Sequence, residues 1–357
     1  MSGDHLDARE GQQGAPAGQL QPRSYTGPEI AAMTLPDPDP VVLYAERGCT
    51  FDLVGPTKSG KTTLTLLACK AVLSGEPFLD VPTKRVPVLY LTEQTRSSFK
   101  GKQTTIGFLP DCDDFHVLFI ADFTGWAWPD VCEFVRKEIS RFTIGLVIID
   151  TLTDWAHMEN ENDAAEALCV MRPLRTIAED GVAVVTCRHS GKGRHDDEDV
   201  VDVGRGSSAF AGAVDTLCVL GGVRGQGHPN QRQLRFVSRK DGIPPTLIVE
   251  LRAGHYVALG DAPNVEYRLA RDFVLEHLPS REDEALTEKE ILAACKGLFS
   301  RRTLGRVLNG ERGTGGLIRE GSVTGKLGAG GASAKAFGYW VLHGEDDGED
   351  LELFDED

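Results

Sequence analysis

The stretch that decides the fold reads Gly55-Pro56-Thr57-Lys58-Ser59-Gly60-Lys61-Thr62, the pattern G-x-x-x-x-G-K-T. The apolar run 51–54 before it predicts a buried strand, and the run 63–73 after it predicts a helix. In such a loop successive backbone N–H groups curl around phosphate oxygens, and the helix N-terminus adds partial positive charge. An ordinary glycine-rich turn is the alternative, but eight matching positions in this context favour a phosphate-binding loop.

The same pattern assigns a role to individual residues of the loop. Lys61 is expected to reach the terminal phosphates of ATP, and the Thr62 hydroxyl is expected to ligate Mg²⁺. The residues expected to contact the nucleotide are Gly55, Pro56, Thr57, Lys58, Ser59, Gly60, Lys61, Thr62 and Thr63. The motif thus predicts a bound nucleotide without saying which work its hydrolysis drives.

Composition restricts the class of protein. A chain of 357 residues is long enough for one large α/β core and a small second unit. No stretch approaches the ~20 apolar residues that span a bilayer, and residues 1–21 lack the apolar centre of a signal peptide, so we expect a cytoplasmic protein with no membrane partner. The eight cysteines include no C-x-x-C pair, which favours free thiols over disulfides or zinc.

The net charge of −16 is unevenly distributed. Residues 343–357 contain nine carboxylates and no Lys or Arg, so the rest of the chain carries only −7. We expect a disordered, solvated acidic tail. Docking to a basic partner, or competition for a DNA-binding surface, is the functional alternative. The global charge therefore does not exclude nucleic acid as a partner.

Hydrophobic patterning predicts a core of alternating strands and helices after a disordered segment and linker at 1–40. Continuous Val/Ile/Leu runs indicate strands buried on both faces, hence a mostly parallel sheet covered by helices. After residue 230 the pattern alternates and predicts an antiparallel extension of the same sheet within a core of 41–260. The expected strands are 51–54, 86–92, 116–120, 145–149, 182–187 and 214–220, and the expected helices are 61–74, 129–141 and 162–180.

The segment 265–342 is expected to form a separate small α+β unit. A capping box at 287–290 opens one helix, and a second helix starts at Ser300 and carries Arg301, Arg302 and Arg306. A glycine-rich stretch, 313–338, follows and is expected to form a hairpin. Helix, turn, basic helix and hairpin outline a winged helix that binds duplex DNA. A helical oligomerisation cap with solvated arginines remains the alternative.

Four apolar residues that end in a carboxylate, Leu146-Val-Ile-Ile149-Asp150, form the pattern that holds Mg²⁺ in P-loop enzymes. From about 41 to 257 the chain resembles the RecA-like ATPases, and among them the RepA-type plasmid helicases related to DnaB. The matching text is Val88-Leu-Tyr-Leu-Thr-Glu93, Val147-Ile-Ile-Asp-Thr151, the acidic loop 159–163, His189-Ser-Gly-Lys192, Arg205-Gly-Ser-Ser-Ala209 and Gly212-Ala-Val-Asp215.

The resemblance implies further roles around the γ-phosphate. It implies that Glu93 polarises the attacking water and that His189 senses the phosphate, whereas Arg188 replaces the first of two histidines usual in the family. A carboxylate near the phosphate is also what water activation requires. A surface glutamate at a strand end is the structural alternative. We therefore expect a hydrolysis site built from Glu93, Asp150 and His189.

The resemblance also implies a ring. The loop after His189 would face a central pore, so Lys192 and Arg194 are candidates for contact with single-stranded DNA, although the neighbouring acids favour a mobile loop instead. A neighbouring subunit would supply a cation in trans, from Arg239, Lys240 or Arg205, if these are not merely surface charges.

Two functions fit these observations. The first is a homo-oligomeric, most simply hexameric, DNA-stimulated ATPase that acts as a helicase or replication motor of a mobile genetic element. The second is an ATP-switched regulator that oligomerises on DNA without unwinding it. A small-molecule kinase is disfavoured, because no cluster of lid arginines follows the core.

Overall fold

The structure is a computed structural model that describes residues 24–32, 39–108, 111–160, 163–190, 208–223, 230–312, 317–323 and 336–341. The chain divides into two compact units, Met1–Asp39 and Pro40–Asp357. The first contains helix α1 (Gly27–Ala31), which opens with a capping box between Thr26 and Glu29. The expected acidic tail, the pore residues Lys192 and Arg194, and the trans candidate Arg205 lie outside the described residues.

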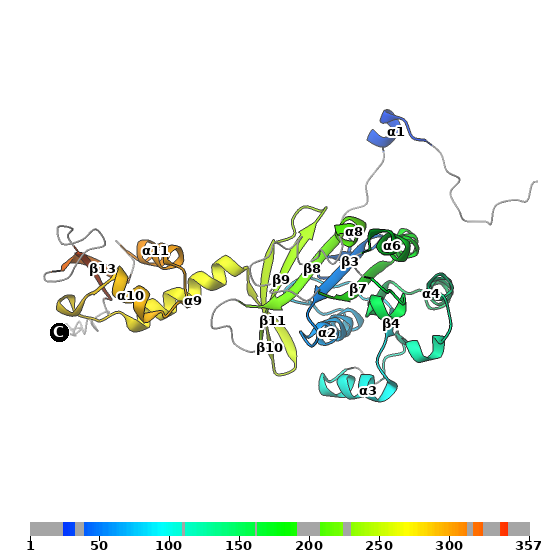
Figure 1. The fold of residues 1–357 in the computed structure, drawn as a ribbon, viewed down its shortest axis with the longest axis horizontal. Coiled ribbons are helices and arrows are strands. Elements are labelled where there is room, and N and C mark those ends of the chain that lie inside the picture. The colour runs from blue at the N-terminus through cyan, green and yellow to red at the C-terminus, as the bar shows by residue number, and fades with distance from the viewer. Residues whose placement is uncertain are drawn as a thin grey trace, which may run out of the picture. The chain divides into compact units, whose positions relative to one another are not determined.

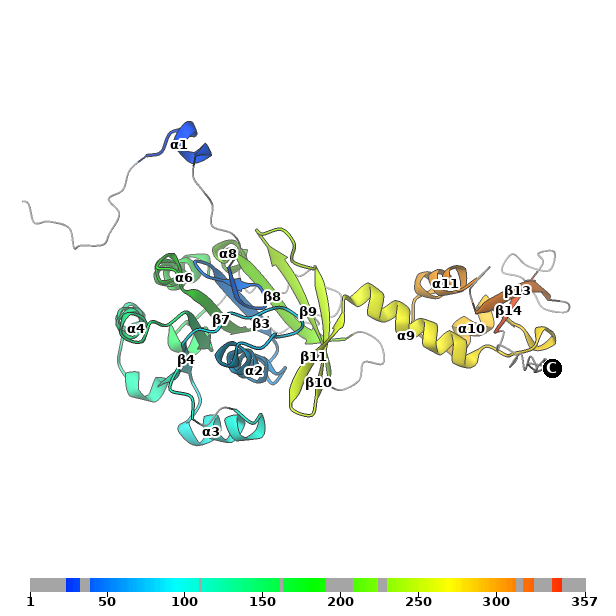
Figure 2. The same ribbon diagram turned by 180° about the vertical axis from the view of Figure 1, so that it is seen from behind.

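Within the described part of the second unit, a nine-stranded sheet has the order β11-β10-β9-β8-β3-β7-β6-β4-β5 (Figures 1 and 2). Strands β8, β3, β7, β6, β4 and β5 run parallel, and β9, β10 and β11 extend the sheet antiparallel from β8. The bounds are β3 Thr50–Gly55, β4 Val88–Thr92, β5 Phe115–Phe119, β6 Leu146–Asp150, β7 Ala183–His189, β8 Thr216–Gly222, β9 Gln231–Ser238, β10 Thr246–Arg252 and β11 His255–Gly260. This is the expected RecA-like P-loop architecture.

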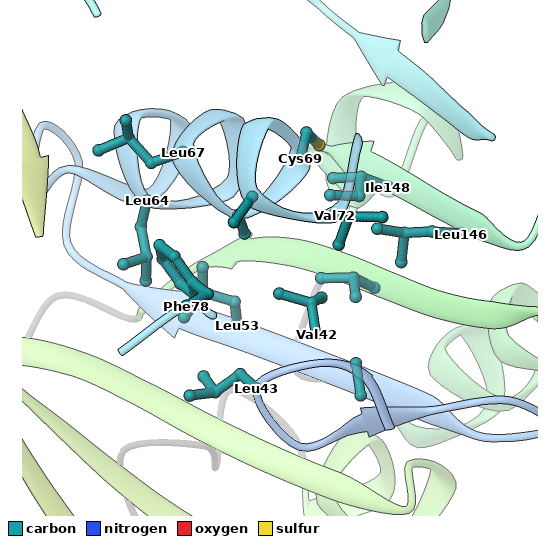
Figure 3. Close-up of a cluster of buried hydrophobic side chains, with 14 of the residues drawn as sticks. Val42, Leu43, Leu53, Leu64, Leu67, Cys69, Val72, Phe78, Leu146 and Ile148 are labelled. Atoms are coloured by element: carbon teal, nitrogen blue, oxygen red, sulfur yellow. The ribbon is translucent and has the colours of Figure 1, made fainter. Parts of the chain in front are cut away.

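Helices cover both faces of the sheet and create two apolar layers. One layer contains α2 (Lys61–Ser74), and Figure 3 shows its Leu64 and Val72 beside Leu53 and Leu146 of the sheet. The other contains α4 (Trp128–Phe142) and α6 (Ala164–Glu179). Because Leu53 belongs to one layer and its neighbour Val54 to the other, β3 is buried on both sides, which explains its unbroken apolar run.

Short elements complete the core. They are β1 Pro40–Val42, β2 Ala45–Glu46, α3 Arg96–Thr105, the 3₁₀ turn η1 Ile120–Phe123, α5 Leu152–Trp155 and α8 Ser208–Ala213. Helix α3 was not expected from the sequence. Its only buried residue is Phe99, so it lacks an apolar stripe, and its start is marked by Thr95, whose hydroxyl accepts a hydrogen bond from the N–H of Ser98 at 3.3 Å.

The C-terminal part has its own apolar core around Val274, Ile291 and Val307. Its elements are α9 Ala262–His277, η2 Glu282–Glu284, β12 Leu286–Thr287, α10 Glu288–Ala294, α11 Arg301–Gly310, β13 Ile318–Val323 and β14 Ala336–Val341. The last two strands form an antiparallel hairpin, and β12 joins it in the order β12-β14-β13. Helix α9 was not expected, and it crosses residue 265, so the boundary expected there falls inside a helix.

Candidate functional site

The glycine-rich loop joins the end of β3 to the start of α2. A side chain at Gly55 is not tolerated, because an added Cβ would lie 2.7 Å from the backbone oxygen of Leu220. Gly60 adopts φ = 105°, a left-handed conformation that favours glycine, directly before the first helical residue. The loop therefore presents backbone N–H groups at the positive end of a 14-residue helix, as an anion site requires.

Lys61 lies within this loop and is only 5% exposed. Its Nζ donates to the carbonyl oxygens of Gly55 at 2.8 Å and Pro56 at 3.1 Å, and it lies 3.2 Å from Nδ1 of His189. Because an ammonium group only donates, Nδ1 must accept, which places the ring proton on Nε2. Nδ1 of His189 also lies 3.3 Å from the Thr57 hydroxyl. Strand pairing explains this contact, since Gly55 and His189 are partners in the parallel β3–β7 register.

The two expected carboxylates, Asp150 and Glu93, meet at the same sheet edge. Thr92 pairs with Asp150 in the β4–β6 register, and the N–H of Glu93 donates to the Asp150 carbonyl at 3.0 Å. Among the described residues, Oδ1 of Asp150 and Oε2 of Glu93 are buried without a hydrogen-bond partner. Burial, followed by the negative charge of Asp150, raises the pKa of Glu93 to about 7. These are carboxylate oxygens prepared for a ligand.

The donor set fits Mg²⁺. Thr62 is half-buried in the first turn of α2, and Asp150 offers the unpartnered Oδ1. Mg²⁺ takes hard oxygen ligands, typically one or two carboxylates plus the phosphates of a substrate. The second oxygen of Asp150, Oδ2, accepts a hydrogen bond from the hydroxyl of Tyr90 at 2.8 Å. Burial and then the charge of Asp150 raise the pKa of Tyr90 well above its usual range, so this phenol keeps its proton.

Two residues of the antiparallel extension reach the loop, and neither was expected there from the sequence. Nε of Arg232 on β9 donates to the carbonyl oxygen of Ser59 at 3.1 Å. The hydroxyl of Tyr256 on β11 lies 3.1 Å from the position that a Cβ on Gly60 would occupy. Burial raises the pKa of Tyr256 while the charge of Arg232 opposes it. No local pattern marks these residues, because only the pairing of β8 to β11 brings them to the loop.

Arg188, beside His189 in the sequence, does not join the site. It is 1% exposed and forms an ion pair with the fully buried Asp52, with an NH2–Oδ2 distance of 2.6 Å. The Thr186 hydroxyl donates to the same carboxylate at 2.8 Å, and the guanidinium stacks 3.8 Å from the ring of Phe210. A charged residue in the apolar run of β3 was the available signal for this structural pair.

The trans candidates Arg239 and Lys240 lie away from their own phosphate loop. They follow β9, whose Ser238 pairs with Thr216 at the start of β8, whereas the loop follows the end of the parallel β3. Lys240 forms an ion pair with Glu46, and NH2 of Arg239 donates to the carbonyl oxygen of Gly212 at 2.5 Å. Neither cation is therefore part of the site within one chain.

The three arginines of α11 lie on its exposed side, opposite the buried Leu304 and Val307. Nε of Arg301 pairs with Glu288 at 2.7 Å, and the guanidinium of Arg306 lies 5.3 Å from the ring centre of Tyr267. Arg302 is exposed. These side chains are available to a partner outside the fold.

One of three comparisons with known proteins, the match to a family model, spans the nucleotide site. Residues 44–195 match the model of the AAA domain family, a span that contains the loop, Glu93, Asp150 and His189 but less than half of the chain. No curated protein matches the sequence. A KaiC-like protein of the archaeon Pyrococcus horikoshii is 14% identical over 60% of this chain and 90% of its own, with a TM-score of 0.45. Among the described residues, no helix has the length and apolar character to cross a membrane. The chain carries a RecA-like P-loop fold, and its match to the AAA domain supports ATPase activity.

Proposed function

We propose that the protein hydrolyses ATP as a ring-forming motor that acts on DNA, in the manner of a helicase or replication ATPase. The observation that carries the proposal is the pair of buried carboxylate oxygens, one on Asp150 and one on Glu93, that have no hydrogen-bond partner among the residues that the structure describes. In this proposal, the Asp150 oxygen helps to hold Mg²⁺ and the Glu93 oxygen accepts a proton from the attacking water. Transfer of a phosphoryl group to water needs both roles.

Each residue has a distinct task in this mechanism. Bound Mg²⁺, held by Thr62 and Asp150, would neutralise charge on the phosphates. Lys61 exchanges its contacts with the Gly55 and Pro56 carbonyls for phosphate oxygens. Glu93, with its pKa near 7, takes the proton of the attacking water.

His189 links the phosphate to the chain beyond it. Its Nδ1 contacts Lys61, so movement of Lys61 toward a phosphate would break that contact and leave the contact with the Thr57 hydroxyl. The position of His189 would then depend on whether a γ-phosphate is bound. This is how hydrolysis would be transmitted to DNA within the ring.

Oligomerisation is part of the proposal, with six subunits as the expected ring. Arg239 and Lys240 lie at the opposite ends of the strands from the loop, so they serve a phosphate only on a neighbouring chain. A cation supplied in trans stabilises charge on the transferred phosphoryl group. The geometry therefore supports sites shared between subunits.

A second candidate function, an ATP-switched DNA-binding regulator, is favoured by the C-terminal part. Its order of helix, strand, helix, helix and hairpin supports the expected winged helix, in which α11 would be the helix that enters a major groove. The exposed Arg301, Arg302 and Arg306 supply cations for a duplex backbone. The same domain is compatible with the motor, where it would recruit duplex DNA.

One experiment separates the two functions. The ATPase rate of the full chain is measured with and without single-stranded DNA, and the native mass is measured with a non-hydrolysable ATP analogue. A motor is stimulated by single-stranded DNA and forms a ring, whereas a regulator binds duplex DNA with ATP without this stimulation. Lys61→Ala is the matched control. Hydrolysis no faster than in that control would refute the motor, and duplex binding that does not depend on ATP would refute the regulator.

A further inference from the structure

Two buried hydroxyl groups join the loop helix α2 to Asp150. The hydroxyl of Tyr90 donates to Oδ2 of Asp150 at 2.8 Å, and it lies 2.9 Å from the hydroxyl of Thr65. Tyr90 is 0% exposed, Asp150 1% and Thr65 4%, so water does not compete for these bonds. A polar chain in an apolar layer is costly unless each of its members has a partner.

The two hydrogen bonds, Thr65 to Tyr90 and Tyr90 to Asp150, run in one direction. Tyr90 has a single proton and gives it to the Asp150 carboxylate, because a bond to an ionised acceptor is the stronger one. The Tyr90 oxygen must then accept, so Thr65 is the donor. The Thr65 hydroxyl also lies 3.2 Å from the carbonyl oxygens of Lys61 and Thr62, and these contacts are longer than the 2.9 Å to Tyr90.

This direction decides how Asp150 is presented. Oδ2 is occupied by Tyr90, which leaves Oδ1 as the buried oxygen without a partner among the described residues. Thr65 stands three residues after Thr62 on helix α2. The two hydrogen bonds therefore connect Asp150 to the helix that carries Thr62, and these are the two residues expected to hold the metal. Rotation of the carboxylate would break the bond to Tyr90.

We propose that Tyr90 is a positioning residue for the metal site, fixing the Asp150 carboxylate so that Oδ1 faces Mg²⁺ and tying it through Thr65 to the helix that carries Thr62. The inference rests on the proposed nucleotide function and deepens it. Packing alone does not explain this tyrosine. Its ring contacts Phe99 and Phe115, with centres 5.4 and 6.2 Å away, and a phenylalanine would make the same contacts.

The test compares Tyr90→Phe with the wild type in the full chain, using a fluorescent ADP analogue as the probe. Binding is titrated with Mg²⁺ and also measured in EDTA. Removing an outer partner of a metal ligand typically weakens metal affinity by about 10- to 100-fold. The Mg²⁺ midpoint should therefore rise at least about tenfold, whereas binding in EDTA should stay unchanged. Phe99→Leu, which alters the same packing without removing a hydroxyl, should leave the Mg²⁺ midpoint unchanged.

Variants of Thr65 provide an independent arm should Tyr90→Phe not fold. Thr65→Val keeps the shape but removes the donor, so the Mg²⁺ midpoint should rise by less than in Tyr90→Phe, and Thr65→Ser should restore it. Mn²⁺ bound with ADP should show the same ranking by paramagnetic resonance.

Three results would overturn the inference. In the first, folded Tyr90→Phe has the wild-type Mg²⁺ midpoint. In the second, its binding falls equally in EDTA and Mg²⁺, which indicates a structural role only. In the third, Thr65→Val and Thr65→Ser behave alike. The proposed function fails separately, and the inference with it, if the wild type binds the probe equally well with and without Mg²⁺.

Discussion

Replacing Glu93 by glutamine should make the protein more stable and much less active. Glutamine keeps the shape of the side chain but removes a charge that burial and Asp150 make unfavourable. The variant should still bind ATP with Mg²⁺, because Lys61 and Thr62 are intact. Its hydrolysis should be slower by about 10²- to 10⁴-fold, the usual contribution of a general base.

The gain in stability follows from the pKa of Glu93. Its carboxyl group is raised from the ordinary 4.5 to about 7 in the folded chain. Each pKa unit of that difference corresponds to about 1.4 kcal/mol, so the ceiling on the gain is about 3.5 kcal/mol. Because the side chain is only half-buried, solvent screening reduces this ceiling. We expect Glu93→Gln to raise the free energy of unfolding by about 1–2 kcal/mol.

The sign and the pH range of this effect are fixed. The folded pKa lies above the unfolded one, so the folded chain holds the proton more tightly and loses stability as pH rises from about 4.5 to about 7. Below that range both states are protonated and the variant gains nothing, whereas above it the full gain is present. The difference between wild type and variant should therefore grow between pH 4.5 and 8.

Urea unfolding of both proteins at several pH values between 4.5 and 8.5 tests this reasoning. Glu76→Gln, the same replacement at an exposed position just after α2, is the control for loss of one carboxylate away from the site. The argument is refuted if the Glu93→Gln difference is independent of pH, or if the variant is less stable than the wild type at pH 8.

Three further outcomes are expected. Arg188→Met leaves Asp52 as an unpaired buried charge and should lower the free energy of unfolding in urea by about 3–5 kcal/mol. The double variant Arg188→Met with Asp52→Leu should recover most of that loss. Equal losses in the single and the double variant would show that the unpaired Asp52 charge is not the cause. Deleting 261–357, which removes α9 whole, should leave the basal ATPase rate of the core unchanged in a steady-state assay; loss of that rate in a folded core would assign a catalytic part to the deleted segment. Replacing Arg302 and Arg306 by alanine should weaken duplex binding and lower the log–log salt slope by about 1.8, as measured by fluorescence anisotropy; an unchanged slope would argue against contact of α11 with DNA.

Much of the core could be predicted because its signals are local. The loop fixes where β3 ends and α2 begins, and the run before Asp150 fixes β6 to within a residue. The meeting of Glu93 with Asp150 also follows from sequence, since parallel strands that end in polar residues place them at one edge. The expected antiparallel extension is confirmed in β9, β10 and β11.

The missed features depend on pairing that no local pattern encodes. Arg232 and Tyr256 reach the loop only through the register of the antiparallel strands, and each lies in an alternating segment like many others. Tyr90 reads as one more apolar strand residue until Thr65 and Asp150 are placed beside it. Helix α9 was missed because only three of its 16 residues are buried, which leaves a weak apolar stripe.

The contacts of Arg239 and Lys240 bear on how a ring could form. Both cations are already engaged, Lys240 with Glu46 and Arg239 with the Gly212 carbonyl, so a role in trans requires these contacts to be exchanged. The Lys240–Glu46 pair is partly exposed, and such pairs contribute only about 1 kcal/mol or less. In the proposed ring, a γ-phosphate on a neighbouring chain would carry more charge than the Glu46 carboxylate and would compete favourably for Lys240. The contacts of the single chain would then hold the two cations in place without opposing assembly. The exchange would also depend on nucleotide, because a phosphate bound to the neighbouring chain would supply the replacement anion.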